Sequence, residues 1–375
     1  MVCFRFYKKE VLQAKEIVMR RILSILLASA AMLLVAAPAF AQAGPYKVLK
    51  TSKVGGEGGF DYIYADSAGR NLYVARSGAA GHIAVYNLDT LAPVGDIPNV
   101  SGHGATIDVK TGHGFATSKP VAMFDAKTFA LIKKIDVQGS PDGYLDDPFN
   151  SRVYILSHSA PNVTILDAKD GAILGTIDIG GAPEQAATDG KGHIYIDIED
   201  KNAIAVIDAA TMKMTGKYDV SSKGGGCAGL ALDAKNGILF AACRDQKNMI
   251  ILSAKDGKIL DSLPIGVGCD GATFNPATME VFSSQGDGTL TVIKENSPTS
   301  FSVEQNVVTP VRAKTITLDA KTGHLYLATS EYGPPPPPAP APAPAAGAAP
   351  GGRPGGGGRG GPAIPDSFSL IVVGK

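Results

Sequence analysis

Short runs of alternating apolar and polar residues, separated by turns rich in Asp, Asn and Gly, repeat along most of the chain. In each repeat an Asp or Asn begins a turn that leads into a strand of aromatic and β-branched residues, as Asp66 leads into residues 72–75. Alternation bounded by such turns predicts antiparallel β-strands rather than helices. The unit occurs seven times, with its second strand at 72–75, 114–117, 153–156, 194–196, 239–242, 281–283 and 325–328.

Most repeats continue beyond this hairpin into two further strands. In the third repeat, residues 163–166 predict a third strand and residues 173–177 a fourth. Four strands in a unit of about 40 residues are typical of a propeller blade. The sequence therefore predicts an all-β fold, a seven-bladed β-propeller of four-stranded antiparallel blades that occupies residues 42–375.

The two ends of this region predict how the ring closes. Residues 46–51 resemble a fourth strand that is not preceded by the first three, and residues 368–373 resemble a third strand that no fourth follows. Pairing of these two segments would complete the last blade and remove exposed sheet edges. We therefore expect the N-terminal strand to pair with the C-terminal blade.

The N-terminal segment is typical of a secretory signal peptide. The basic motif Met19-Arg20-Arg21 precedes an apolar run at 22–37, and residues 38–41 (Pro-Ala-Phe-Ala) place small residues before a cleavage site. We predict removal of residues 1–41, which leaves a periplasmic or secreted protein with no stable membrane span. The alternative is an uncleaved anchor, but Pro38 interrupts a run that would need about 20 apolar residues to span. Residues 1–18 are either an extended basic region or precede the true start at Met19.

Several segments of the repeats resemble a known family. They read Gly-Gly-Phe-Asp-Tyr at 58–62, Gly-His-Gly at 102–104, Pro-Glu-Gln-Ala-Ala-Thr-Asp-Gly-Lys-Gly at 183–192 and Gly-Asp-Gly-Thr-Leu-Thr-Val at 286–292. With the repeat and the export signal, they make residues 44–375, apart from one insert, similar to the exported bacterial YVTN-repeat, YncE-like seven-bladed propellers. The resemblance implies the fold and the compartment but no particular reaction, because one propeller fold carries many functions.

Charge and motifs exclude several classes of function. The chain has 35 basic and 35 acidic residues, and residues 1–41 hold six of the basic and two of the acidic ones, so the mature balance is 29 to 33. A mildly acidic protein is not expected to bind nucleic acid, which selects a basic surface. The sequence contains no Gly-x-Ser-x-Gly elbow, phosphate loop or His-Glu-x-x-His helix, which argues against the commonest hydrolase, nucleotide and zinc-protease classes.

One column of the aligned repeats carries most of the candidate chemistry. It lies near the start of each innermost strand, and innermost strands of a propeller converge on the axis, so its members are expected to form a ring at the mouth of a central tunnel. The next column is rich in glycine, as expected where backbones crowd together. The column reads Asp61, His103, Asp142, Glu184, Ala228, Asp270 and Lys314.

We expect this ring to bind a small ligand, with Asp61, His103, Asp142, Glu184, Asp270 and Lys314 as the binding residues. Its four carboxylates, Asp61, Asp142, Glu184 and Asp270, are candidate ligands for a divalent cation, because Ca²⁺ and Mg²⁺ prefer carboxylate oxygens. The alternative is a hydrated tunnel whose polar groups bind nothing specific. His82 and His158 follow second strands and are expected to face solvent rather than to act as ligands.

Three cysteines remain after cleavage at Ala41: Cys227, Cys243 and Cys269. Counting back from the hairpin turn at 233–237 places Cys227 opposite Cys243, close enough for a disulfide after small adjustment, and an oxidising compartment favours that bond. Cys227–Cys269 is the rival pairing, and a three-thiol metal site is a third possibility.

Residues 333–365 form a low-complexity insert rich in Pro and Gly, which predicts a disordered loop. The insert falls between the second and third strands of the last blade, so it is expected to emerge on the face that carries the polar ring. It would act as a spacer, as a flap, or as a connecting loop with no specific role.

These features favour a non-catalytic exported binding module that uses the tunnel mouth. Its expected partner is a small molecule, a metal or a cell-envelope protein. We expect the protein to be a monomer. The alternative is a divalent-metal-dependent hydrolase of the lactonase type at the same site, in which a metal would polarise a carbonyl and activate water and His103 or a carboxylate would act as base. A redox partner is a third hypothesis, disfavoured because the chain has no Cys-x-x-Cys-His motif and no Trp.

Overall fold

The computed structural model describes residues 44–334 and 361–375. The predicted signal peptide at 1–41 and the central part of the insert, residues 335–360, lie outside the described residues. Within the described ranges the regular secondary structure is β-strand apart from one short 3₁₀ turn, η1 (Glu199–Lys201).

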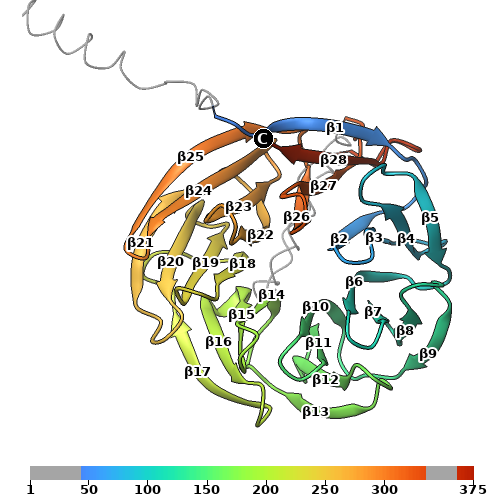
Figure 1. The fold of residues 1–375 in the computed structure, drawn as a ribbon, viewed down its shortest axis with the longest axis horizontal. Helices are drawn as coiled ribbons and strands as arrows, with labels where there is room; N and C mark the ends of the chain where they lie inside the picture. Colours follow the sequence, from blue (N-terminus) through green and yellow to red (C-terminus); the bar gives the residue numbers. More distant parts are fainter. Residues whose placement is uncertain (1–43, 335–360) are drawn as a thin grey trace, which may run out of the picture. The chain divides into compact units, whose positions relative to one another are not determined.

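Seven four-stranded antiparallel sheets follow one another around a ring, which confirms the predicted seven-bladed propeller (Figure 1). We number the blades by their innermost strands, which run in chain order. Blade 1 contains β2 (Phe60–Asp66), β3 (Asn71–Arg76), β4 (His82–Asn87) and β5 (Pro93–Ile97); blade 2 contains β6 (Gly102–Asp108), β7 (His113–Ser118), β8 (Val121–Asp125) and β9 (Leu131–Ile135); blade 3 contains β10 (Pro141–Asp147), β11 (Arg152–Ser157), β12 (Val163–Asp167) and β13 (Ile173–Ile177).

The remaining blades have the same order from the inside outwards. Blade 4 contains β14 (Pro183–Thr188), β15 (His193–Ile198), β16 (Ala203–Asp208) and β17 (Lys213–Asp219); blade 5 contains β18 (Cys227–Asp233), β19 (Ile238–Cys243), β20 (Asn248–Ser253) and β21 (Ile259–Pro264); blade 6 contains β22 (Cys269–Asn275), β23 (Glu280–Gln285), β24 (Thr289–Ser297) and β25 (Ser300–Val308); blade 7 contains β26 (Lys314–Leu318), β27 (Leu325–Thr329), β28 (Ser369–Gly374) and β1 (Lys47–Lys53).

Blade 7 confirms the predicted closure. Its outermost strand is β1, which pairs antiparallel with β28 from Lys53 opposite Ser369 to Lys47 opposite Gly374. The two ends of the propeller are therefore joined by backbone hydrogen bonds within one sheet (Figure 1). The pairing also covers the edge that β28 would otherwise present to solvent.

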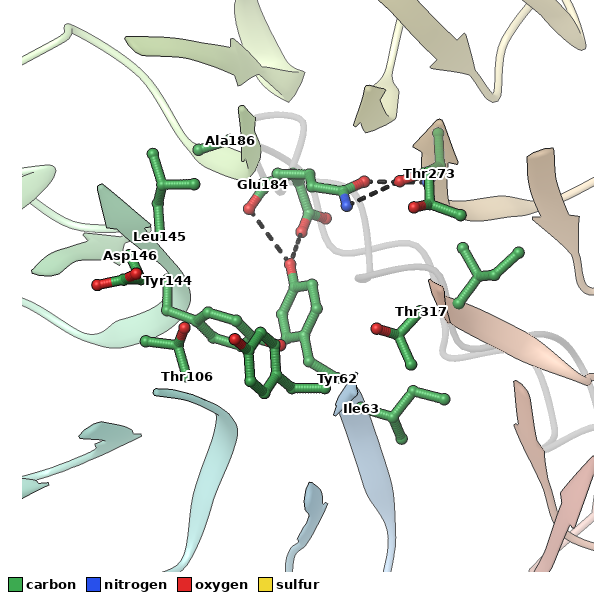
Figure 2. Close-up of a pocket in the computed structure, with 14 residues that line it drawn as sticks. Tyr62, Ile63, Thr106, Tyr144, Leu145, Asp146, Glu184, Ala186, Thr273 and Thr317 are labelled. Carbon is green, nitrogen blue, oxygen red and sulfur yellow. Dashed lines mark hydrogen bonds between the residues drawn. The ribbon is translucent and has the colours of Figure 1, made fainter. Parts of the chain in front are cut away.

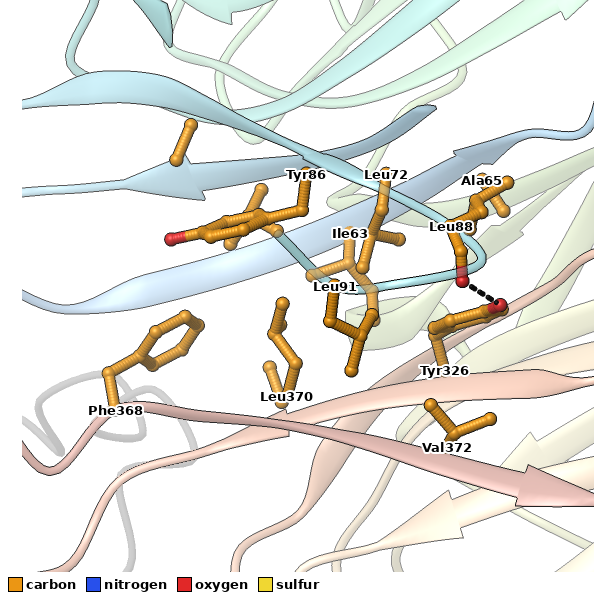
Figure 3. Packing of buried hydrophobic residues seen from close by; sticks show 13 residues of the cluster. Ile63, Ala65, Leu72, Tyr86, Leu88, Leu91, Tyr326, Phe368, Leu370 and Val372 are labelled. Atoms are coloured by element: carbon orange, nitrogen blue, oxygen red, sulfur yellow. Dashed lines mark hydrogen bonds between the residues drawn. The ribbon is translucent and has the colours of Figure 1, made fainter. Parts of the chain in front are cut away.

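The core is divided among the interfaces between successive blades, because each twisted sheet buries one face against the next. Seven clusters of buried apolar side chains fill these interfaces. At the interface of blades 7 and 1, Leu370 and Tyr326 pack against Leu72 and Leu88 (Figure 3). This interface exists only because the last blade returns to meet the first.

A tyrosine on the second strand of a blade also ties it to the next blade. The Tyr326 hydroxyl donates to the Leu88 carbonyl at 2.7 Å, as Figure 3 shows. Tyr73 and Tyr195 make the equivalent bonds to the carbonyls of Ala126 and Ala254, at 3.2 and 3.1 Å. The aromatic position that recurs in the sequence therefore fills the core with its ring and satisfies its hydroxyl on the neighbouring blade.

The predicted disulfide is present between Cys227, the first residue of β18, and Cys243, the last residue of β19. The two residues face each other in the strand register, as the hairpin count predicts. Cys269 is buried and free, so the rival Cys227–Cys269 pairing is wrong. The three-thiol metal site is wrong for the same reason, since two of its sulfurs are bonded to each other.

The Pro/Gly-rich insert lies between β27 and β28, and its described ends pair with each other. Tyr332 forms an isolated bridge with Ala363, and the Gly333 amide donates to the Pro362 carbonyl at 2.9 Å. The Arg312 guanidinium lies 4.0 Å from the centre of the Tyr332 ring. Because Arg312 precedes β26, the base of the insert lies on the face where the chain enters the innermost strands.

Across the described residues, no helix is both long enough and apolar enough to cross a membrane.

The disulfide gives a first testable prediction. Cys227 and Cys243 are 16 positions apart, and closing a loop of this size stabilises the folded state by about 3 kcal/mol. The variant carrying both Cys227→Ala and Cys243→Ala should lose about that much free energy of unfolding in urea. Cys269→Ala is the control: it keeps the disulfide, so adding reductant should lower its free energy of unfolding as much as that of wild type. Equal free energies of unfolding for the double variant and wild type would contradict the prediction.

Candidate functional site

The structure brings the six predicted site residues together at the end of the ring where the chain enters the innermost strands. Five of them occupy the second position of their strand, and Lys314 occupies the first position of β26. Similar places on six blades therefore become neighbours, although they are far apart in sequence. The strands and their residues are β2 with Asp61, β6 with His103, β10 with Asp142, β14 with Glu184, β22 with Asp270 and β26 with Lys314.

One half of this cluster combines carboxylates with imidazoles. His103 Nδ1 lies 2.7 Å from Asp61 Oδ2 and 2.9 Å from Asp142 Oδ1. The other oxygen of Asp142, Oδ2, lies 3.4 Å from His158 Nε2. His158 is about half exposed, as expected from its loop, but it also joins the site. The expectation that it only faces solvent is corrected, because the end of β11 lies beside the start of β10.

The other half combines carboxylates with permanent cations. Lys314 Nζ lies 3.0 Å from Asp270 Oδ2. The Arg244 guanidinium lies 3.1 Å from Asp270, 3.6 Å from Glu184 and 2.6 Å from Glu199. Arg244 and Glu199 were not predicted from the sequence, since they follow second strands rather than begin innermost ones.

Arg244 completes the ring where the aligned column has Ala228. Both residues belong to blade 5, and the Arg244 side chain reaches acids on both neighbouring blades, Glu184 on blade 4 and Asp270 on blade 6. Acids and bases consequently alternate around the axis. We call this set the mouth ring: Asp61, His103, Asp142, His158, Glu184, Arg244, Asp270 and Lys314.

Burial and close neighbours shift the ionisation of the ring. Hydrogen bonds to Asp142 and Asp61 raise the pKa of His103 to about 10. Burial, then a hydrogen bond with Glu199, raises the pKa of Glu184 to about 10. Burial lowers the pKa of Lys314, but the carboxylates of Asp270 and Asp61 outweigh that effect and raise it overall. At neutral pH the His103 imidazole is therefore charged, and the hydrogen-bonded Glu184–Glu199 pair binds a proton more readily than a free carboxyl does.

A cavity of about 240 Å³ lies between the innermost strands and reaches Glu184 of the ring (Figure 2). Tyr62, Tyr64 and Tyr144 contribute to its lining, and the Tyr62 hydroxyl donates to Glu184 Oε2 at 2.9 Å. The predicted glycine column is explained here: a Cβ on Gly104 would lie 2.2 Å from the Tyr144 ring. Gly104 thus leaves room for an aromatic ring that lines the cavity, whereas Gly143 and Gly229 lie against the backbone of the neighbouring blade, as expected where strands crowd together.

The candidate metal ligands are divided into smaller sets than the sequence suggests. Donor atoms of Asp61, His103 and Asp142 lie within 4.8 Å of one another, and so do those of Asp142, His158 and Glu184. Asp270 is in neither set and is instead paired with Lys314 and Arg244. A cation at the ring would therefore meet imidazole nitrogen as well as carboxylate oxygen.

Comparison with known proteins establishes the fold and leaves the function open. No protein-family model matches the chain, and no curated protein matches its sequence. Many solved structures do match, among them a chain of the structure described as "Crystal Structure of Mitotic Checkpoint Complex". The TM-score is 0.65 and the identity 10%, over 78% of this chain and 91% of that one. At such low identity the likeness shows the β-propeller fold alone, so function has to be argued from the site.

The raised pKa of His103 predicts a pH-dependent contribution to stability. A histidine whose pKa rises from 6.5 to about 10 on folding stabilises the fold fully below the lower value and loses that stabilisation as the pH rises towards the upper one. Wild type should therefore exceed His103→Gln in free energy of unfolding most at pH 6, with a gap that shrinks steadily to pH 10. Urea unfolding at several pH values measures this gap; a gap independent of pH would contradict the prediction.

Proposed function

We propose that the protein is a non-catalytic binding module that holds a small polar ligand at the mouth ring, and that it is exported, as its resemblance to the YVTN-repeat propellers implies. The observation that carries the proposal is the ring itself, in which all seven blades contribute acids or bases at the end where the chain enters the innermost strands. The Cys227–Cys243 disulfide supports export, because such bonds persist in oxidising compartments.

A purely structural role explains this ring poorly. Buried ion pairs are often no more stabilising than apolar residues of the same size, and the seven apolar interfaces already hold the blades together. Ionisable groups with shifted pKa values gather where a protein binds or transforms something. Glu184 and His103 are such groups: Glu184 lines the cavity, and the His103 side chain is about half exposed rather than buried in a blade interface.

The pattern of charge indicates what kind of ligand fits. Arg244 and Lys314 form a cationic pair around Asp270, while Asp61 and Asp142 form an acidic pair around His103. A small zwitterion can place its anionic group towards the first pair and its cationic group towards the second. The proposed ligand class is therefore a small molecule that carries both signs of charge, such as an amino acid or short peptide.

A thermal-shift panel tests this proposal. Amino acids, dipeptides, dicarboxylic acids and diamines would be added to the purified mature protein, and a zwitterionic class should raise its melting temperature. Ligand at a hundredfold excess over Kd stabilises the fold by about 2.7 kcal/mol. Asp270→Asn should weaken the shift, because Asp270 positions Lys314 and, together with Glu199 and Glu184, positions Arg244.

The matched control is Asp189→Asn, which breaks a His193–Asp189 contact of 2.8 Å outside the ring, in the turn between β14 and β15. It should respond to ligand as wild type does. The proposal fails if no zwitterion shifts the melting temperature, or if Asp270→Asn responds as strongly as wild type.

A second candidate is the divalent-metal-dependent hydrolase of the lactonase type. The observation that favours it is the Asp61, His103 and Asp142 set, whose donor atoms are close enough to share one ion. A metal there would polarise a carbonyl and lower the pKa of bound water. Lactone hydrolysis should then require added metal and vanish in Asp142→Asn; hydrolysis that survives this substitution would exclude the ring as its site.

A further inference from the structure

We propose that Asp61, His103 and Asp142 form a three-ligand site for a divalent transition-metal ion, with His158 positioning Asp142. This inference deepens the proposed function, since it rests on the same mouth ring and names an ion that the ring would hold. It differs from the sequence expectation of Ca²⁺ or Mg²⁺ on four carboxylates in both the ligands and the ion.

The three side chains are close enough to share one ion. Their donor atoms all lie within 4.8 Å of one another, with His103 Nδ1 2.7 Å from Asp61 Oδ2 and 2.9 Å from Asp142 Oδ1. Tetrahedral bonds of about 2.1 Å place ligand atoms about 3.4 Å apart. An ion would therefore replace the Nδ1 proton that these side chains share and move the ligand atoms slightly apart.

The donor atoms select the class of ion. Ca²⁺ takes six to eight oxygen ligands, whereas this set offers one imidazole nitrogen and two carboxylates. Imidazole with carboxylate suits Zn²⁺, Mn²⁺, Fe²⁺ or Co²⁺. A catalytic or ligand-binding ion of this kind has three protein ligands and leaves further positions for water or an incoming molecule.

Charge directs the ion to this half of the ring. Asp270 is already paired directly with two cationic side chains, Arg244 and Lys314. Asp61 and Asp142 are both paired directly with His103, which becomes neutral when it gives its lone pair to a metal, while Lys314 acts on Asp61 without an ion-pair contact and His158 lies beside Asp142. Two carboxylates and one neutral imidazole carry two negative charges, which a divalent ion balances.

His158 positions Asp142, and one side of the proposed metal site is open to solvent. His158 Nε2 lies 3.4 Å from Asp142 Oδ2 and so turns the other oxygen, Oδ1, towards His103. Such an outer partner orients a metal ligand, and its loss commonly weakens binding about 10- to 100-fold. The Asp142 side chain is 10% exposed, whereas that of His103 is 52% exposed. The ion would thus be anchored on a buried carboxylate and remain open to solvent on one side.

Calorimetric titration of chelator-treated mature protein with Zn²⁺ tests the assignment. Wild type should bind one ion at this site, Asp142→Asn should lose the binding, and His158→Ala should weaken it about 10- to 100-fold. Co²⁺ in place of Zn²⁺ should give visible absorption bands from nitrogen and oxygen ligands in wild type but not in Asp142→Asn. His103→Ala is a second ligand variant for use if Asp142→Asn does not fold, as judged by circular dichroism.

A control separates this site from generic surface binding. His193→Ala removes a His–Asp pair outside the ring whose separation is 2.8 Å. It should bind Zn²⁺ as wild type does. The proposal is overturned if wild type binds no ion, if folded Asp142→Asn or His103→Ala binds as tightly as wild type, or if His193→Ala abolishes binding.

The Zn²⁺ titration and the thermal-shift panel can succeed or fail independently of each other. Chelator-treated protein that still responds to zwitterions in the thermal-shift panel, but binds no Zn²⁺, would overturn the metal site and leave the binding module intact. Zn²⁺ binding without any response to the panel would support the metal site and contradict the zwitterion proposal.

Discussion

The burial of each blade against the next is the interaction on which the rest of the structure depends. A single four-stranded sheet leaves apolar faces open to water, and they become core only when both neighbours are in place. The seventh interface forms where β27 and β28 of blade 7 meet blade 1, and the pairing of β1 with β28 joins the two ends of the chain within that blade. Tyrosine hydroxyls such as that of Tyr326 add hydrogen bonds from one blade to the next. The mouth ring follows from this repeated packing, because six innermost strands carry a polar residue at a similar position near their start.

In this repeat fold the residues of the mouth ring come together from separate blades, so no local sequence motif predicts the site. Six of the blades each contribute one polar side chain near the start of the innermost strand, which by itself is a common and uninformative feature. Convergence brings these side chains within hydrogen-bonding distance and removes much of their water, which shifts the pKa values of His103 and Glu184. The alternation of sign limits the electrostatic cost, because each acid lies between bases. Arg244 contributes to this balance from the blade whose column position is Ala228.

The sequence predicts most of the fold because the repeat is regular. Turn residues, strand periodicity and the unmatched strands at the two ends together specify seven blades and their closure, and the hairpin count pairs Cys227 with Cys243. The sequence pattern predicts the candidate site less completely than the fold. Alignment on innermost strands finds Asp61 and Asp270 but misses Arg244, Glu199 and His158, which lie just beyond second strands and reach inwards. Their roles depend on side-chain direction and on contacts between blades, and a one-dimensional alignment contains neither.

The shared last blade has a consequence for the order of folding. Lys47 pairs with Gly374, so the first strand to be synthesised cannot reach its partner until nearly the whole chain is available. Blades 1 to 6 each form from continuous segments, whereas the final sheet requires the longest loop closure in the molecule, a step with a large entropic barrier. Until that step, β1 is an unpaired strand of a kind that can add to the edge of another molecule's sheet. The same dependence on a late pairing partner that closes the finished ring therefore leaves the incomplete chain prone to self-association through β1.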